Sequence, residues 1–386
     1  MRGYGRARAE RGRLVAVAGI LSLPYPEPLM RTTRRIVPGL IASAALLLVL
    51  PSPAAAQGTA RGLDIDGSAI SSGMGGASAA VFWSAEPNIW ANPALLGYYR
   101  GVRYQQAWSQ LVPGLASDVF LESNRVTLGA CGVGIMGGHG QLDYGKSIEV
   151  GEGGEVIGVY HSYEKVRLEA VGVSLAGLAD GLAPGSRLAG LGRNFDLAFG
   201  IARKSVEMGF TGFPIDASGP CYDVGLLARA GYDFGGPVSG FLPVRMDAAF
   251  GAAVLNANDV TFRFLEEVPP SRLRNLGGSL RLAVGRPAGW GGLLRGLDPL
   301  VSLGGAWDAE HVQAGDDEDA GYDVTHVGAE ITLLNVLSAR VGHVTDREGG
   351  IEDLAWGVGV GLPIAGVAGI RFEKIGRASC RERVLT

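Results

Sequence analysis

Alternation of apolar with small or polar residues restricts the fold of this chain more than any other feature. It is clearest in four segments: 194–201, 223–234, 326–333 and 354–362. In the first of them, Phe199 and Ile201 share one face, while Asp196 and Gly200 share the other. A period of two over 8–12 residues is typical of a β-strand. With further candidates along the chain, the pattern predicts an all-β fold of about 14 long antiparallel strands.

Charged residues occur on the second face of these strands: Asp196, Asp223, Arg229, Asp233, Glu330 and Arg340. Long strands with one apolar face and one small or charged face are typical of a transmembrane β-barrel with a polar lumen. In such a lumen the charges either line a route and clamp a plug, or form an inert ion-pair network that fills the space. A soluble β-sandwich is the alternative fold, and its apolar face would point into a core.

The glycine content and the hydropathy of the chain restrict the possible folds further. The chain has 62 glycines in 386 residues, against a usual share of about 7%, which disfavours helices. No run of 18 or more apolar residues occurs outside the N-terminal region, so the mature chain does not span a membrane with helices. The best candidate helix is Glu86–Gly97, and three polar segments are predicted loops: Gly137–Gly154, Ala257–Asn275 and Gln313–Gly321.

The N-terminal region predicts export. Residues 30–56 contain a basic stretch, an apolar stretch and the sequence Ala54-Ala55-Ala56 before Gln57, which together form a secretory signal with its cleavage site. Residues 1–29 match no targeting pattern and are predicted to be an upstream extension from a wrongly chosen start codon. Export of a barrel predicts location in the bacterial outer membrane, with outer-membrane lipid as a partner.

The opposite end breaks the pattern. Residues 375–384 read IGRASCRERV, which is the translation of a common sequencing-library adapter. We therefore predict that 375–386 is an artefact, that these residues leave the sheet, and that a closing C-terminal strand is missing. Without residues 1–56, which carry a net +6, and 375–386, which carry a net +2, the formal charge falls from −4 to −12. An acidic chain without a basic run disfavours nucleic-acid binding.

Two blocks carry a family resemblance. Residues 73–97 read GMGGASAAVFWSAEPNIWANPALLG, with the motif Asn92-Pro93-Ala94, and His326–Leu362 contains a G-x-E strand followed by an R-x-G strand. These blocks resemble the PorV/PorQ-like family and, more loosely, the FadL-type fatty-acid transporters. The chain departs from the family after the first motif, where Leu95 replaces the usual glycine.

The resemblance implies a barrel formed by residues 101–374, with residues 57–100 folded inside it as a plug. Two functions are compatible with it. FadL-type members pass hydrophobic small molecules through the outer membrane, and PorV-type members serve as accessory barrels that handle secreted protein cargo. Passage of hydrophobic molecules is the leading prediction; the secretion accessory and a purely structural barrel are the alternatives.

Motifs for catalysis or cofactor binding are weak. Gly132–Gly137 fits G-x-G-x-x-G, but no helical pattern follows it to bind a phosphate. The acidic run 316–319 lacks the spacing of a calcium loop. The histidines lack metal-ligand spacing, so we predict no enzyme, no cofactor and no metal site. Cys131 and Cys221 either pair or remain two isolated thiols.

Overall fold

The computed structural model describes residues 60–378 with short gaps. The gaps are 112–115, 187–189, 191, 193, 212–215, 235–241, 259, 264–266, 286–298, 314–320, 347–350 and 365–367. The chain divides into two compact units, Met1–Leu50 and Pro51–Thr386, and all the described residues belong to the second. The predicted upstream extension, the predicted signal peptide and the acidic run 316–319 lie outside the described residues.

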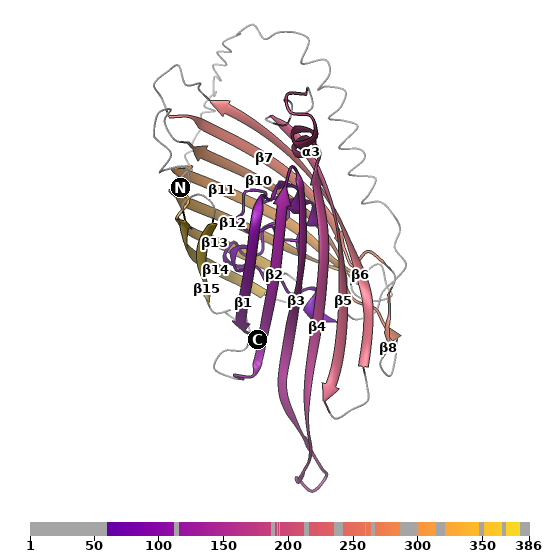
Figure 1. Cartoon of the computed structure of the whole chain (residues 1–386). Helices are drawn as coiled ribbons and strands as arrows, with labels where there is room; N and C mark the ends of the chain where they lie inside the picture. Colours follow the sequence, from indigo (N-terminus) through magenta and orange to yellow (C-terminus); the bar gives the residue numbers. More distant parts are fainter. Residues whose placement is uncertain are drawn as a thin grey trace, which may run out of the picture. The chain divides into compact units, whose positions relative to one another are not determined.

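One antiparallel sheet dominates the described chain (Figure 1). Its thirteen strands are β1 (Gly101–Gln110), β2 (Val119–Ala130), β3 (Val133–Val150), β4 (Val156–Ser174), β5 (Phe195–Thr211), β6 (Asp216–Phe234), β7 (Val244–Leu255), β10 (Arg272–Val284), β11 (Val301–Gln313), β12 (Tyr322–Leu333), β13 (Leu337–Asp346), β14 (Ile351–Ile364) and β15 (Ala368–Ala378). Each strand pairs with the next one in this order. Two short strands, β8 (Phe262–Arg263) and β9 (Glu267–Val268), form a separate hairpin. The predicted all-β antiparallel barrel fold is confirmed, with thirteen strands in the main sheet of the described chain where about 14 were predicted.

Helices in the described part of the chain are few and short: η1 (Arg61–Leu63), α2 (Ala69–Gly73), η2 (Pro93–Tyr98) and α3 (Leu175–Leu182). The predicted helix over Glu86–Gly97 is wrong, because only its last part is helical, as the 3-10 turn η2. Pro87 and Pro93 have no backbone N–H and disfavour a continuous helix there. Within the described residues, no helix is long and apolar enough to cross a membrane.

The two faces of the sheet differ sharply in burial. On β5, Phe199 is 47% exposed and Ile201 is 58% exposed, whereas Asp196 is buried. The same parity continues around the sheet: large exposed apolar side chains lie on the outward face, which also has charged positions such as Arg203 and Glu207, and the inward face carries buried small, charged and apolar residues. A soluble sandwich would bury the apolar face instead. Leu227 breaks the alternation of β6, and it is buried on the inward side beside Ala94 and Leu95.

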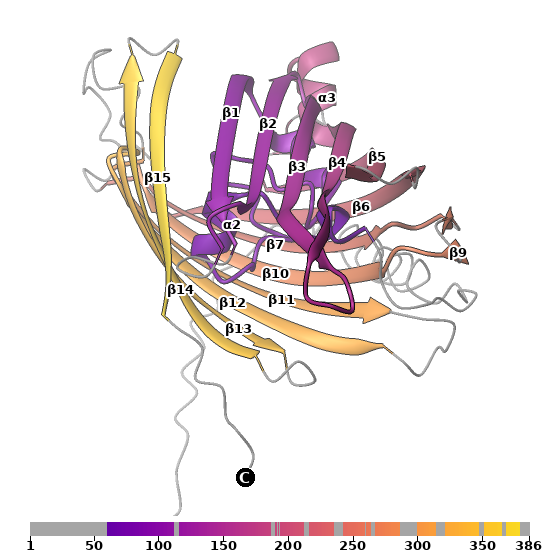
Figure 2. The ribbon, with the colours of Figure 1, turned by 90° about the horizontal axis from the view of Figure 1, so that it is seen from below.

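The inward face surrounds Ala60–Arg100, called the N-terminal segment here (Figure 2). Its residue Gly62 contacts Glu164 on β4. Its residue Gly73 lies against Gly357 on β14, near the other edge of the sheet. The segment therefore contacts strands near both ends of the strand order.

One predicted loop is wrong. Residues 137–150, within the polar segment Gly137–Gly154, belong to β3 and pair with both β2 and β4 over much of that length. The glycines in this segment hide the alternation that predicts a strand. Glycine is needed at Gly138 because a Cβ there would lie 2.6 Å from the carbonyl oxygen of Asn124. The nearby G-x-G-x-x-G sequence begins in the turn between β2 and β3, where Cys131 and Gly132 have φ values of 50° and 75°, as tight hairpins require.

The last strand extends further than predicted. Residues Ile375–Ala378 continue β15 and pair with β14 from Gly357 to Leu354, so the expectation that the chain leaves the sheet at Ile375 is wrong for these residues. Residues 379–386 lie outside the described part, and the adapter origin of 375–386 stays a prediction. Among the described residues, β1 and β15 are the two edge strands, with no ladder between them.

Candidate functional site

The predicted motif Asn92-Pro93-Ala94 lies buried where the N-terminal segment meets the sheet. Asn92 caps η2, since its Oδ1 accepts a hydrogen bond from the backbone N–H of Ala94 at 3.0 Å. Its Nδ2 donates to the carbonyls of Ala79 and Leu226, each at 3.0 Å. Pro93 begins η2, a position where its missing N–H costs nothing. One side chain thus joins two turns of the segment to β6.

A line of glycines on the inward face receives this motif. Five neighbouring strands each contribute one glycine at matching register: Gly129, Gly134, Gly172, Gly200 and Gly225. We call this set the glycine row. A Cβ on Gly134 would lie 2.1 Å from the carbonyl oxygen of Leu96, and a Cβ on Gly200 would lie 2.2 Å from the carbonyl carbon of Pro93. Only glycine permits backbone to approach backbone this closely.

Glycines on the other half of the sheet receive the earlier part of the segment. A Cβ on Gly251 of β7 would lie 2.2 Å from the carbonyl oxygen of Ala79. On β12 and β13, Gly328 and Gly342 both lie against the backbone of Met74. A few residues further along the segment, the N–H groups of Ser78 and Ala79 donate hydrogen bonds to the buried carboxylate of Asp308 on β11.

A buried ion pair fixes the middle of the segment to β2. Arg125 Nη2 lies 2.8 Å from Glu86 Oε1 as an ion pair, and it donates a hydrogen bond to the carbonyl of Gly67 at 2.8 Å. Its guanidinium lies 5.1 Å from the centre of the Trp90 ring, a favourable cation–π distance. Both charged side chains are almost fully enclosed. Removal of one partner would leave a buried charge unpaired, which is costly.

Two carboxyls of the segment have raised pKa values. Burial, which disfavours the charged form, is the main cause for both Asp66 and Glu86. The charge of Arg125 opposes the rise in each case. Asp66 also accepts a hydrogen bond from the amide of Asn88 at 2.7 Å. The centre of the segment is therefore a polar network enclosed by the sheet.

A second enclosed ion pair lies on β5 and β6. Lys204 and Asp223 are both fully buried, and their Nζ and Oδ2 atoms are 2.9 Å apart. Asp223 also accepts the backbone N–H of Asn256 at 2.8 Å. The ammonium of Lys204 lies 3.4 Å from the carbonyl of Leu63 in η1. This pair thus contacts the start of the segment.

The other predicted lumen charges have separate environments. Asp196 accepts hydrogen bonds from Ser174 and from the N–H of Ala176, so it fixes the start of α3. Arg229 lies over the rings of Phe82 and Tyr98 in the segment, at 5.3 and 5.4 Å. Asp233 is exposed.

Asp233 pairs with Arg245 at 3.0 Å, away from the segment. Glu330 and Arg340 pair with each other on β12 and β13, and Arg340 also contacts Glu373 on β15 at 2.7 Å. The six predicted charges therefore do not meet in one site.

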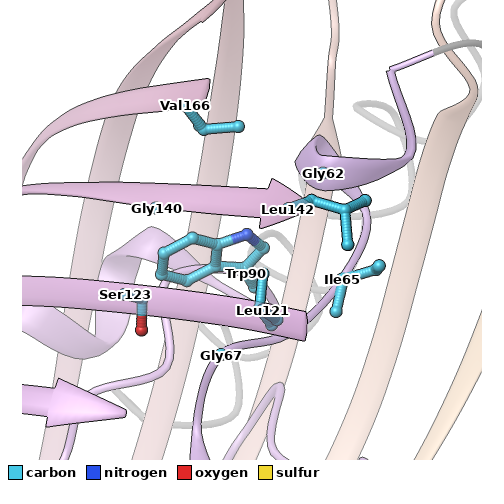
Figure 3. A pocket seen from close by; sticks show the side chains of 9 residues that line it. All are labelled: Gly62, Ile65, Gly67, Trp90, Leu121, Ser123, Gly140, Leu142 and Val166. Atoms are coloured by element: carbon cyan, nitrogen blue, oxygen red, sulfur yellow. The ribbon is translucent and has the colours of Figure 1, made fainter. Parts of the chain in front are cut away.

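A small cavity separates the N-terminal segment from β2, β3 and β4 (Figure 3). Its lining is mostly apolar or small: Gly62, Ile65, Gly67, Trp90, Leu121, Ser123, Gly140, Leu142 and Val166. The volume of this cavity is about enough for one water molecule. Among the described residues, Trp90 Nε1 and Ser123 Oγ are buried without a hydrogen-bond partner. Both belong to residues that line the cavity.

Sequence reasoning missed Arg125, Lys204 and Asp308 as contacts of the segment. Parity on the strand was the available signal, because Arg125 and Lys204 each lie two positions away from buried, inward-facing residues on either side. No group of three or more potential metal ligands occurs in the described chain. Cys131 and Cys221 are both free, the first exposed and the second buried.

Comparison with solved structures shows a weak structural likeness. No protein-family model matches the sequence, and no curated protein is significantly similar to it. Among solved structures, the chain is similar to the Ralstonia pickettii toluene transporter TbuX, with a TM-score of 0.31 and 12% identity over 77% of this chain and 90% of that one. A similarity this low does not assign a function to the chain.

Proposed function

We propose that this chain is an outer-membrane barrel that passes hydrophobic small molecules, with the N-terminal segment as its plug. The observation that carries the proposal is the reversed distribution of polarity. Large apolar side chains are exposed over much of the outward face of the sheet, and buried charges hold the segment on the inward face. A sheet whose apolar face points outward is stable only where that face meets lipid or another apolar surface.

The outward face of β5 supports a membrane location in more detail. Leu197, Phe199 and Ile201 form an apolar stretch, and the outward positions that follow are Arg203, Ser205 and Glu207. Such a change from apolar to charged residues is typical of the boundary between a bilayer core and its headgroups.

The cavity supports passage between the segment and the wall. Ile65 and Trp90 of the segment face Leu121, Leu142 and Val166 of the sheet across it. An apolar lining with a few polar groups is typical of sites for small hydrophobic molecules. Because the space holds only about one water molecule, a larger molecule needs the segment to move away from β2 at this point.

A reversible covalent lock tests the proposal. A Cβ on Gly67 would lie 3.5 Å from the Cβ of Ser123, a separation that suits a disulfide. The double variant Gly67→Cys/Ser123→Cys, made with Cys131→Ser and Cys380→Ser, is placed in lipid vesicles. Uptake of the uncharged probe N-phenyl-1-naphthylamine is then measured.

We expect the reduced double variant to take up the probe faster than empty vesicles, and the oxidised form to lose that excess. Reduction of the same sample is the matched control. Equal uptake in both forms would show that the segment does not gate at this point. Uptake no faster than in empty vesicles would contradict passage itself.

A further inference from the structure

The apolar part of the outward face is shorter on β4 and β5 than on β7. On β7 every outward position is apolar over Val244–Val254, about 34 Å along the strand, which at the usual strand tilt gives an apolar band roughly 25 Å tall. On β5 the same face is apolar only over Phe195–Ile201, about 20 Å. On β4, Val173 and Val171 are followed directly by Glu169. These two strands therefore present charges at a depth where β7 presents apolar side chains.

Five exposed charged residues lie side by side in this region, and we call them the charged patch. They are Lys165, Arg167 and Glu169 on β4, and Arg203 and Glu207 on β5. Arg203 and Glu169 are 3.8 Å apart, but their side chains remain 52% and 76% exposed. Charged side chains at the depth of the hydrocarbon are costly against lipid, and in membrane proteins they usually face other protein groups or water.

The signs of these charges follow a regular arrangement across the two strands. Lys165 pairs in register with Glu207, and Glu169 pairs in register with Arg203. Each cross-strand pair thus contains one cation and one anion. The cation lies on β4 in the first pair and on β5 in the second. Arg167 lies between the two pairs, opposite Ser205.

This arrangement is complementary to a copy of itself. A two-fold axis perpendicular to the membrane, between β4 and β5, exchanges the two strands of the facing copy without changing their depth. Lys165 then faces Glu207 of the second copy, and Arg203 faces Glu169 of the second copy. Self-complementarity of this kind is what a two-fold symmetric interface requires.

We propose that the charged patch is the interface of a two-fold symmetric dimer of this chain in the membrane. The proposal rests on the membrane location proposed above, but not on the passage of small molecules. Hydrocarbon matches none of the five charges, and anionic lipid headgroups match only the three cations. A second copy matches both signs and also covers the charges from lipid.

The test measures association of the full chain in phosphatidylcholine vesicles by energy transfer between copies. Cys131, which is exposed in the turn between β2 and β3, is labelled with a donor or an acceptor dye in a Cys380→Ser background. The variants are Glu169→Arg and Arg203→Glu in the charged patch. Glu352→Arg, at an exposed outward position on β14, is the matched control. Resistance to protease shows that each variant is folded.

We expect the wild type and Glu352→Arg to dimerise at the same protein-to-lipid ratio. Each patch variant alone should need at least about a tenfold higher ratio, because like charges then face each other across the axis. An equimolar mixture of Glu169→Arg and Arg203→Glu should recover the dimer, since the charges of one variant then face opposite charges of the other at both positions. Pairing within one chain cannot produce this recovery.

A wild type that stays monomeric would overturn the proposal and leave lipid headgroups or another protein as the occupant of the patch. The same conclusion follows if the mixture associates no better than the single variants, or if Glu352→Arg loses as much as they do. Uptake of N-phenyl-1-naphthylamine by vesicles that contain the unlabelled wild type is read separately. Passage and dimerisation can therefore fail independently of each other.

Discussion

The amide of Asn92 donates a hydrogen bond to the carbonyl of Leu226 at 3.0 Å, across 134 positions of sequence. The side chain also caps η2 and binds the carbonyl of Ala79. We expect Asn92→Ala to lower the free energy of unfolding by at least about 2 kcal/mol, because three buried backbone groups lose their partner. Chemical unfolding of the barrel in detergent measures this. Asn124→Ala on the outward side of β2 is the control, and a similar loss there would contradict the assignment.

Gly200 and Gly278 give a matched pair of glycine substitutions. A Cβ on Gly200 would meet the backbone of Pro93, whereas a Cβ on Gly278 would meet nothing within 4 Å. We expect Gly200→Ala to destabilise the fold by about 1–3 kcal/mol through overpacking, and Gly278→Ala to be neutral or slightly stabilising. Thermal unfolding of both variants is the measurement. Equal melting temperatures would mean that the segment does not press against the glycine row.

Lys204 and Asp223 are expected to behave as a coupled pair. Lys204→Met alone leaves a buried carboxylate without its cation, which costs about 3–5 kcal/mol. The double variant Lys204→Met/Asp223→Asn should be more stable than Lys204→Met, because it buries no charge. A double-mutant cycle measured by urea unfolding gives the coupling energy. Additive effects of the two changes would contradict the pairing.

Ile201 and Ser205 test the membrane boundary on β5. Arginine at the centre of a bilayer costs about 2–4 kcal/mol, and this cost falls to about 0–1 kcal/mol near the interface. We therefore expect Ile201→Arg to impair folding into lipid vesicles strongly, and Ser205→Arg to have little effect. The folded fraction is read from resistance to protease. Equal effects of the two substitutions would argue against the proposed position of the bilayer.

The sequence predicted the strands well because parity is a local property. The outward position of Ile201 and the inward position of Asp223 both follow from alternation within one strand. The helix expected at Glu86–Gly97 failed, because tertiary contacts such as those of Asn92 decide the shape of a segment rich in proline and small residues. The loop predicted over Gly137–Gly154 failed because the glycines from Gly137 to Gly140 lie within β3, and only those from Gly151 to Gly154 belong to the turn that follows.

Local sequence patterns could not predict which residues pair with the inward-facing charges. Parity places Asp196 and Arg340 on the same face, but it does not show that Asp196 holds α3 while Arg340 contacts Glu373 on β15. Such pairings depend on the curvature of the sheet and on the path of the N-terminal segment. Arg125 illustrates the same limit, since its partner Glu86 lies outside the helices and strands, where no periodic pattern applies.

The glycine row also decides which parts of this chain can be exchanged with those of another barrel. The glycine row contacts residues 92–99 mainly through backbone atoms. The fit therefore depends on the path of the backbone, which a segment from another protein would not reproduce. A chimera that replaces only the first hundred residues would meet a wall shaped for a different path. The earlier part of the segment fits the other half of the sheet in the same way. The sheet and the N-terminal segment therefore form one unit of recombination, and a working chimera must carry both from the same parent.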